Sequence, residues 1–314
     1  MFMSSRNILN LVLLATILVL VAVVFFKPGQ IPEPVAIKLT TLSTTDITHI
    51  LIERRNNSNI VLVKESGIWR MQEPYHLHAN DFRVQSVLRL AEAESISQHD
   101  LSNLNPAEFA LDAPEVSVTF NGNTKLDFGN TAALQQNRYI STNGKLHLAA
   151  ESSSYHLMSK AENFLSHALL EPGAKIVKLE LPELTLTLAD GKWSRLPESP
   201  DISADATTEL LNEWRSAQAL ELRPYENMTG QPVKIYLQDN DTPVELMAKM
   251  SDDNFILANK AAGIQYTLPE EKMAQLFKLP ILVEPEEIEP VNPVTDDSID
   301  ASSQPAPATV RQVD

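Results

Sequence analysis

The sequence predicts an α+β protein, with a single N-terminal transmembrane helix followed by two tandem, similar α+β units whose sheets are mostly antiparallel. Three observations lead to this prediction. Residues 8–26 are almost entirely apolar. Two stretches, around Trp69 and Trp193, repeat one pattern, in which an alternating strand runs into a Gly turn and Trp follows two residues later. Short alternating segments bounded by turn residues, with few amphipathic helical segments between them, are typical of antiparallel sheets.

The repeated pattern has clear markers in both copies. They are Gly67, Trp69, Pro74 and Asp81 in the first copy and Gly191, Trp193 and Asp205 in the second. Similarity over this length indicates two copies of one folded unit. Because both Trp residues follow a turn at matched places on a strand, we expect them to pack in the core and not to form a ligand platform.

The N-terminal apolar segment predicts a membrane anchor. Residues 8–26 number 26 − 8 + 1 = 19 and are apolar except for Asn10 and Thr16, and a spanning helix needs about 20 residues. A cleaved signal peptide is the alternative, but it has an apolar stretch of about 7–15 residues and small residues at its cleavage site. Residues 23–26 here are Val-Val-Phe-Phe. We therefore expect residues 1–27 to be an uncleaved anchor that contacts the lipid bilayer through residues 8–26.

The orientation of the anchor is only weakly determined by charge. Arg6 precedes the apolar segment and Lys27 follows it, which gives a slight bias towards an N-terminus inside. Because nearly all of the chain follows the anchor, we expect a short cytoplasmic start and a large extracytoplasmic part.

The first unit is expected at residues 46–172, after a Pro/Gly linker at 28–45. Its helix should begin near Asp81, because Val84, Val87, Leu88 and Ala91 form one apolar stripe. Asn80 or Asp81 should cap that helix. A second helix, at about 153–170, should close the unit. Its strands are expected at residues 49–54, 60–63, 68–71, 116–120, 125–128, 139–141 and 145–148.

Turn and edge residues complete the first unit. Asn121-Gly122 and Asn143-Gly144 are pairs that hairpin turns favour, because both central positions need positive φ. Arg54 and Arg55 are expected on a solvated edge, where charge discourages pairing with other chains.

The second unit is expected at residues 173–280 and repeats the same order. Its helix is expected at residues 205–219, and a short helix at 269–277 should have Pro269 at its first position, where the missing N–H costs nothing. Its strands are expected at residues 175–181, 184–188, 233–237, 244–248, 255–258 and 265–268, and Trp193 should lie on a further strand that follows the second of these.

Residues 281–314 change in composition. They hold eight Asp or Glu and one Arg, a net charge of 1 − 8 = −7. With many Pro residues and few groups to bury, they are expected to be an acidic disordered tail.

Composition excludes several classes of function. A formal net charge of −16 without a basic patch argues against a nucleic-acid partner. The absence of Cys removes disulfides, thiolate nucleophiles, Cys-based metal sites and a lipoprotein anchor.

Several stretches of the first copy resemble one family. They are Gly67–Pro74, Ala79–Asp81, Phe109–Pro114 and Leu126–Gly129. The chain resembles the bacterial "domain of unknown function 4340" family, whose members read G-x-W, Pro, A-D, G-L-D-x-P and L-G at these places. Here Ala110 replaces the Gly of G-L-D-x-P and Asn80 separates the A-D pair.

The resemblance covers about residues 45–220, although the second copy lacks the L-D-x-P element. It implies a single-span protein of the bacterial inner membrane with most of its chain outside the cytoplasm. Some members are encoded beside gliding-type transporter parts, namely an ATP-binding subunit, a permease and an auxiliary protein. No catalytic residues are attributed to the family, so none are carried over.

The residues that could carry chemistry have simpler interpretations. His76 and His78 would point to one side of a strand, with Glu73 and Asp81 nearby, but zinc needs three or four ligands and the second copy has no matching His. Asp112 fits a turn before Pro114. The remaining candidates are carboxylate pairs and a serine run: Glu92 with Glu94 on a helix face, Asp252 with Asp253 in a hairpin turn, and Ser152–Ser154 near His156.

We expect solvation to explain the carboxylate pairs and helix capping to explain the serines. No nucleophile elbow, P-loop or dinucleotide fingerprint occurs. The expectation is therefore no catalytic, cofactor-binding or metal site and no cofactor.

Two functions remain open at this point. The first is a non-enzymatic, membrane-anchored scaffold or interaction protein with protein partners in the cell envelope, as an accessory of an ABC-type transport system. The alternative is an envelope hydrolase or glycan-binding enzyme that uses the cleft between the two repeats. That alternative requires Asp, Glu and His with shifted pKa values to converge in the cleft.

Overall fold

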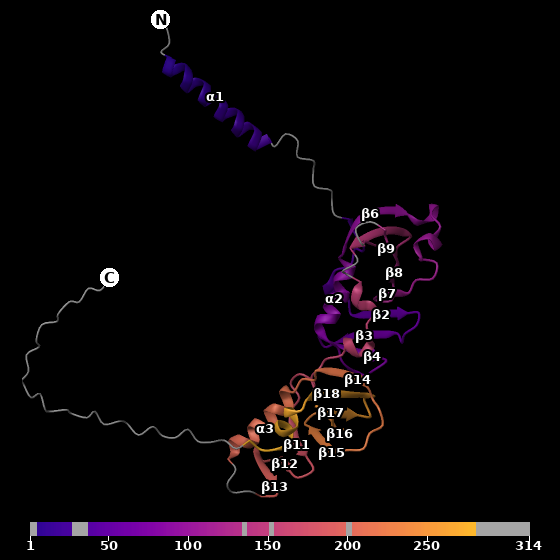
Figure 1. The fold of residues 1–314 in the computed structure, drawn as a ribbon, viewed down its shortest axis with the longest axis vertical. Helices are drawn as coiled ribbons and strands as arrows, with labels where there is room; N and C mark the ends of the chain where they lie inside the picture. The colour runs from indigo at the N-terminus through magenta and orange to yellow at the C-terminus, as the bar shows by residue number, and fades with distance from the viewer. Residues whose placement is uncertain (1–4, 27–36, 134–136, 151–153, 199–202, 281–314) are drawn as a thin grey trace, which may run out of the picture.

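The computed structural model describes residues 5–26, 37–133, 137–150, 154–198 and 203–280. These residues form a helix, α1, and two antiparallel sheets, each with its own helices, which follow one another along the long axis of the molecule (Figure 1). The predicted α+β class with mostly antiparallel sheets is confirmed. The predicted tail and residues 28–36, the first half of the predicted linker, lie outside the described residues.

Helix α1 spans Ser5–Phe26 and lies away from both sheets (Figure 1). Its side chains are described at residue 9 and at residues 12–22. Among the residues that the structure describes, we find no helix long and apolar enough to cross a membrane. The membrane anchor stays a prediction from the sequence.

The first half of the body consists of a ten-stranded sheet with helix α2 (Asp81–Ala91). Its strands are β1 (Ile37–Lys38), β2 (His49–Arg54), β3 (Ile60–Glu65), β4 (Ile68–Glu73), β5 (Leu77–His78), β6 (Glu94–Asp100), β7 (Val116–Phe120), β8 (Thr124–Thr131), β9 (Asn137–Thr142) and β10 (Lys145–Ala150). Its short 3-10 helices are η1 (Thr44–Asp46), η2 (Leu101–Asn103), η3 (Pro106–Phe109), η5 (Tyr155–Met158) and η6 (Ala161–Phe164).

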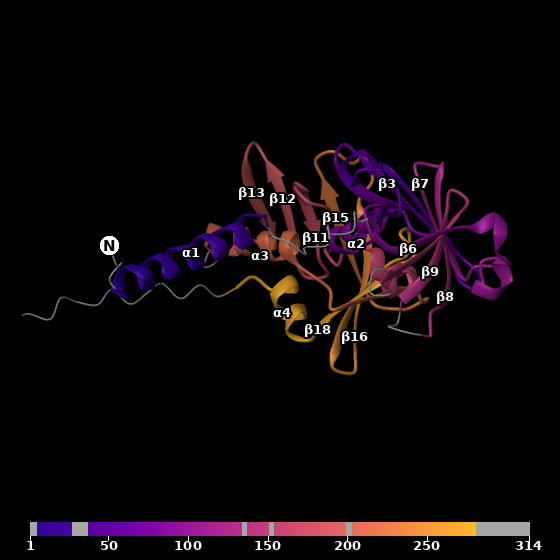
Figure 2. The same ribbon diagram turned by 90° about the horizontal axis from the view of Figure 1, so that it is seen from above.

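The second half consists of an eight-stranded sheet with helices α3 (Ala204–Ser216) and α4 (Glu271–Phe277), which lie next to each other beside the strands (Figure 2). Its strands are β11 (Ile176–Glu180), β12 (Thr185–Ala189), β13 (Lys192–Leu196), β14 (Glu221–Pro224), β15 (Gln231–Leu237), β16 (Val244–Ser251), β17 (Asn254–Asn259) and β18 (Ile264–Pro269).

The two sheets order their strands in the same way. Without the two-residue strands β1 and β5, the first sheet runs β6-β10-β9-β8-β7-β2-β3-β4, and the second runs β14-β18-β17-β16-β15-β11-β12-β13. Each strand of the second sheet therefore takes the place of one strand of the first. Helix α3 lies in the chain between β13 and β14, as α2 lies between β5 and β6.

The helices pack on their sheets through the predicted apolar stripes. Val84, Val87, Leu88 and Ala91 of α2 are all buried, and so are Leu210 and Trp214 of α3. Both helices begin at a capped N-terminus. The side chain of Asn80 accepts a hydrogen bond from Arg83 N at 3.1 Å, and that of Ser203 accepts one from Ala206 N at 3.2 Å.

The hairpin turns have the geometry that their residues predict. Ser66-Gly67 and Asp190-Gly191 connect matched hairpins, and all four residues have positive φ. Asn121-Gly122 and Asn143-Gly144 also have positive φ, which confirms the prediction. Such turns match the right-handed twist of the strands that they join.

The prediction of a helix at residues 153–170 is wrong. The described part of this segment forms the 3-10 helices η5 and η6 and then runs extended from Leu165. Its backbone pairs with residues of both halves, as described below, and this pairing prevails over the local helical pattern. The prediction that the serines cap this helix is wrong for Ser154, whose side chain makes no capping hydrogen bond to η5. Residues 152 and 153 lie outside the described residues.

Three smaller predictions also need correction. Pro269 ends strand β18, opposite Asn254, and α4 begins only at Glu271. Glu92 follows α2 as its C-cap and Glu94 begins β6, so these carboxylates do not share a helix face. Strands β6 and β14 were not predicted, because their exposed polar residues give a weak alternating pattern.

Candidate functional site

The two halves meet along one extended segment, residues 165–172, which we call the connector. Within the first half, Phe164 O accepts a hydrogen bond from Asn80 N at 2.7 Å, and Ser166 N donates to His78 O at 2.9 Å. Three residues later the same segment pairs with the second half. Leu169 N donates to Ala217 O at 3.1 Å, and Ala219 N donates to His167 O at 2.8 Å. The connector is therefore hydrogen-bonded to both halves at once.

An ion pair joins the connector to the first sheet. The guanidinium of Arg70, on β4, donates two hydrogen bonds to the carboxylate of Glu171, and Arg70 Nε lies 3.7 Å from Glu65. The two hydrogen bonds from Arg70 hold the pKa of Glu171 below its usual range. A bidentate pair of this kind fixes orientation as well as charge.

A buried polar network lies next to the junction. The Tyr75 hydroxyl donates to the carboxylate of Glu162, which is 8% exposed. Arg54, 5% exposed, lies near that carboxylate and donates to the backbone oxygens of Ser58 and Ser159. Burial lowers the pKa of Arg54, while the charge of Glu162 acts in the opposite direction. Arg54 is thus a buried network residue, and its predicted place on a solvated edge is wrong.

Tyr75 also reaches the second half. Its ring atoms lie 3.8 Å from the position that a Cβ on Gly263 would occupy, and Gly263 O accepts a hydrogen bond from Tyr225 N beside β14. The ring therefore packs against the second half while its hydroxyl is held by Glu162 in the first half.

One small cavity lies where the described residues of the two halves meet. It has a volume of about 30 Å³ and lies between β5, the connector and β18, with His78, Glu171 and Tyr266 in its wall. This volume has room for about one or two water molecules, whereas ligand pockets measure about 300–1,000 Å³. Burial, with a smaller effect of Glu171, raises the pKa of Tyr266 to about 12. Ionisable groups do converge at the junction, but they are paired or buried around a space too small for a sugar.

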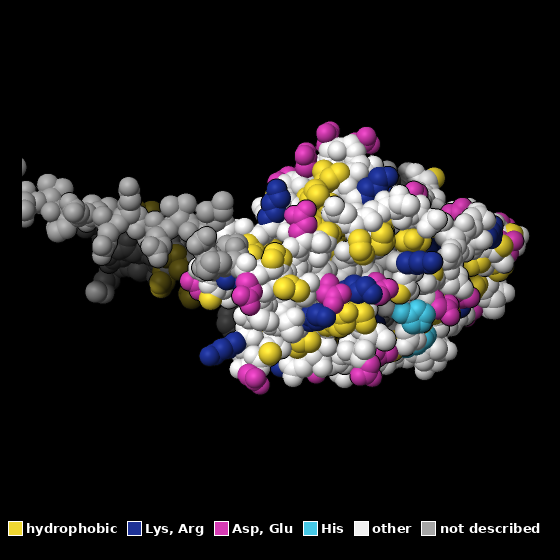
Figure 3. Space-filling model, turned by 90° about the horizontal axis from the view of Figure 1, so that it is seen from below, with side chains coloured by type: hydrophobic (Ala, Val, Ile, Leu, Met, Phe, Trp, Pro, Cys, Tyr) yellow, Lys and Arg dark blue, Asp and Glu magenta, His cyan; other side chains and the backbone are white. Residues whose placement is uncertain are grey.

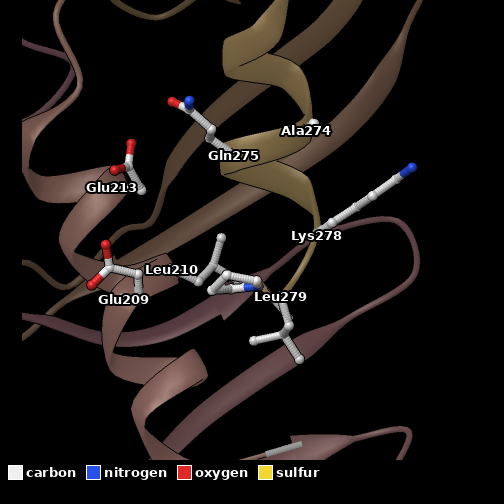
Figure 4. A pocket seen from close by; sticks show the side chains of 8 residues that line it. Glu209, Leu210, Glu213, Ala274, Gln275, Lys278 and Leu279 are labelled. Atoms are coloured by element: carbon white, nitrogen blue, oxygen red, sulfur yellow. The ribbon is translucent and has the colours of Figure 1, made fainter. Parts of the chain in front are cut away.

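A larger hollow lies at the other end of the second half. It has a volume of about 440 Å³ and lies between α3 and α4 (Figure 4). Leu210 and Leu279 form its floor, the carboxylates of Glu209 and Glu213 lie on the α3 side, and Lys278 points away from it (Figure 4). Glu213 is paired with Lys272 at 2.7 Å. The hollow is apolar at its base and open to solvent.

The structure separates the candidate residues predicted from the sequence. His76 is exposed, His78 is half-buried on β5, and no group of three or more His, Cys, Asp or Glu that could hold a metal ion occurs in the described ranges. Asp112 is exposed, and Asp252 lies in the predicted hairpin turn with positive φ. The Glu92 carboxylate accepts a hydrogen bond from Thr44 N at 2.9 Å. His156 Nδ1 lies 2.5 Å from the Arg83 guanidinium.

The repeat markers occupy matched places in the two sheets. Trp69 is 3% exposed, whereas Trp193 is half-buried and packs against the edge of the core. Pro74 and Pro197 follow the matched strands β4 and β13. Asp81 and Asp205 lie in the first turns of α2 and α3, where a negative charge favours the helix dipole.

The junction residues Arg70, Glu162 and Glu171 were missed. Their partners lie far away in the sequence: Arg70 and Glu171 are 101 residues apart, and Tyr75 and Glu162 are 87 residues apart. A local signal existed only for the connector, where Leu169-Leu170 before Glu171-Pro172 resembles a short apolar strand.

Charge on the visible surface is mixed. On the face seen from below the view of Figure 1, Lys and Arg alternate with Asp and Glu, and hydrophobic side chains lie between them (Figure 3). No basic patch dominates that face.

The family model "Domain of unknown function (DUF4340)" matches residues 69–240, which is more than half of the chain, so the chain belongs to this family. The matched region starts on β4 and ends after β15, and thus includes the junction. No curated protein and no solved structure matches the chain.

Proposed function

We propose that this protein is a membrane-anchored, extracytoplasmic scaffold or interaction protein without enzymatic activity, built from two copies of one α+β unit. The observation that carries the proposal is the junction. The connector pairs with both halves, and Arg70–Glu171 and Tyr75–Glu162 fasten it. Such a junction holds two sheets in a fixed relative position, which is what a protein needs to present partners at a set distance from its anchor.

The common strand order supports duplication of one unit. Equivalent strands, hairpin turns with positive φ and capped helices recur in the same sequence in both halves. If the two halves had arisen independently, each would have had to acquire the same order of eight strands, including two long crossover connections. Duplication also explains why the sequence repeats core and turn residues and not polar clusters.

The anchor is supported by the sequence of residues 8–26. The side chains described in this part of α1 include Leu9, Val12, Leu13 and Ile17, all exposed apolar groups. Exposed apolar side chains along a helix require cover, and lipid is the cover that we propose. The body would then lie outside the bacterial inner membrane.

Association with an ABC-type transport system is the most specific form of the proposal. It rests on the resemblance to the family and on no site in this chain. A scaffold of this kind would bind the permease or an auxiliary subunit through exposed strand edges.

The test is fractionation and crosslinking in native membranes. We expect the full-length chain, with its first thirty residues intact, in the membrane pellet after carbonate washing, and we expect its crosslinks to include a transporter permease or auxiliary subunit. Recovery of a shortened chain in the soluble fraction would contradict the anchor. Crosslinks to glycan alone would favour the hydrolase or glycan-binding alternative, for which the 30 Å³ junction cavity offers little room.

A further inference from the structure

Helices α2 and α3 pack on their sheets in the same way. Counted from their N-caps, Asn80 and Ser203, the two helices place buried residues at the same positions. The buried pairs are Val84 with Thr207, Val87 with Leu210, Leu88 with Leu211, and Ala91 with Trp214. A difference between the outer faces of the two helices is therefore not imposed by their packing.

The outer faces do differ. Residues at i, i+4 and i+7 lie on one face of a helix. On α2 the outer residues are Phe82, Ser86 and Arg89. The matched residues of α3 are Asp205, Glu209 and Asn212, all exposed. The first copy thus presents an apolar ring and a cation, with Phe82 68% exposed, where the second copy presents two carboxylates and an amide.

A groove follows this outer face of α2. It has a volume of about 500 Å³ and lies between α2 on one side and the end of β10 with η5 on the other. Phe82 and Arg89 lie along it, and His156 is in the opposite wall. The ring of Tyr155, 76% exposed, lies edge-on to that of His156 with 5.4 Å between their centroids. Two exposed aromatic rings, those of Phe82 and Tyr155, therefore flank the groove.

Two guanidinium groups lie beside these rings. Arg89 donates a hydrogen bond to Ser86 Oγ at 3.0 Å, and Arg83 lies 2.5 Å from His156 Nδ1. In the part of the chain that the structure describes, no carboxylate forms an ion pair with either Arg. Glu94 is the one carboxylate among the residues that line the groove. Both cations can therefore bind phosphate, for which guanidinium groups are well suited.

The predicted anchor would hold this face near a bilayer. Helix α1 ends at Phe26 and β1 begins at Ile37, so ten residues, 27–36, lie between them. Ten residues reach about 35 Å at most. Strand β1 pairs with β6 where Lys38 lies opposite Glu94, at one end of the groove. Because α2 is only about 16 Å long, the whole groove stays within reach of the bilayer, and a tether of this length gives even a weak contact a high effective concentration.

We infer that the outer face of α2 lies against the phospholipid surface of the membrane that holds the anchor. Phe82 and Tyr155 enter the interfacial layer, where aromatic side chains are favoured, and Arg83 and Arg89 bind headgroup phosphates. A lipid surface is favoured over a protein partner because the tether keeps lipid beside this face at all times. The inference rests on the proposed anchor and deepens it, because it assigns the side of the first half that faces the bilayer.

A fluorescent label on α2 tests this contact. The chain has no Cys, so one environment-sensitive dye can be placed at Gln85→Cys, on the exposed side of α2, or at the matched and equally exposed Thr208→Cys of α3. The full chain is reconstituted in vesicles of phosphatidylethanolamine and phosphatidylglycerol. We expect lipids with spin-labelled headgroups to quench the dye at position 85 and not the dye at position 208.

An exchange of residues between the two helices gives the matched variant. Phe82→Asp combined with Arg89→Asn gives α2 the outer residues of α3, and both positions are exposed, so the fold should be kept, which circular dichroism checks. The quenching at position 85 should then be lost. Quenching that persists in this variant would overturn the inference. If the double variant does not fold, Tyr155→Ser leaves α2 unchanged, and undiminished quenching in that chain would equally overturn it.

Flotation of the vesicles separates this inference from the proposed anchor. A chain that floats while position 85 stays unquenched overturns the lipid contact and leaves the anchor intact. A chain that does not float contradicts the anchor and the lipid contact together. In native membranes, a photoreactive residue at position 85 should form adducts with lipid. Adducts with protein alone would assign this face to a protein partner and overturn the inference.

Discussion

Trp69 and Trp193 follow the same turn on matched strands, yet only one of them is fully buried. Trp69 is 3% exposed, and its carbonyl accepts a hydrogen bond from Ala79 N, which lies opposite Leu165 of the connector. Trp193 is half-buried on β13, the last strand of the second sheet. The local pattern thus determines the hairpin, whereas burial depends on which distant segment of the chain packs against it.

The largest effect that tests this comparison is the loss of each Trp. Trp69→Ala should cost about 3–5 kcal/mol, because it empties a closed part of the core. Trp193→Ala should cost about 1–2 kcal/mol, because part of the ring already contacts water. Urea unfolding of the detergent-solubilised chain measures both values. Equal losses would show that the two sites are packed alike.

The junction network gives the next largest effect. Tyr75→Phe removes the hydroxyl that donates to the buried Glu162 carboxylate and should lower the free energy of unfolding by about 1–2 kcal/mol. Tyr225→Phe is the matched control, because its hydroxyl donates a long, exposed hydrogen bond of 3.4 Å to Asn227; it should change stability by less than about 0.5 kcal/mol. If the control is as costly as Tyr75→Phe, the network does not hold the junction.

Replacement of the glycine in each of the two matched turns should lower stability by the same amount. Gly67 and Gly191 have φ of 87° and 75°, and a Cβ added at either position would meet no neighbouring atom within 4 Å. Gly67→Ala and Gly191→Ala should therefore each cost about 1 kcal/mol from backbone strain alone. Thermal unfolding of the two variants side by side provides the measurement. A clear difference between them would show that the hairpins are not equivalent.

The smallest effect concerns the junction ion pair. Arg70 and Glu171 are 31% and 43% exposed, so Glu171→Gln should cost only about 0.5–1 kcal/mol at neutral pH. The folded-state pKa of Glu171 is lowered by Arg70. Its contribution is therefore complete above the usual carboxyl pKa of about 4.3 and is lost as the pH falls through the lowered value.

Unfolding of wild type and Glu171→Gln from pH 7 down to pH 3 measures this effect. The difference in the free energy of unfolding between wild type and Glu171→Gln should disappear towards pH 3. A difference that stays constant with pH would mean that the charge of Glu171 does not contribute to stability.

The sequence predicts those parts of the fold that depend on local pattern. The stripe of α2, the turn at Asn143-Gly144 and the strand before Trp69 were predictable because their causes lie within a few neighbouring residues. The connector was mistaken for a helix because its conformation is set by pairing with residues 78–80 and 217–219. Those partners lie about 50–90 residues away in the chain, beyond the reach of any periodicity.

The residues of the candidate site were equally beyond prediction from local sequence pattern. Arg54 precedes a polar turn and was expected at a solvated edge, but the segment that carries Ser159 and Glu162 folds over it. Nothing near Arg54 in the sequence indicates that cover. Burial of a charged residue by a distant segment becomes visible only once the topology is known.

The most direct test of the central claim is the distance between the two halves in solution. The chain has no Cys, so spin labels can be placed at Asn57→Cys, in the β2–β3 turn, and at Asp253→Cys, in the β16–β17 turn. Double electron–electron resonance should give one narrow distance distribution, which Tyr75→Phe combined with Glu171→Gln broadens. A broad distribution in the chain without these two substitutions would contradict a fixed junction.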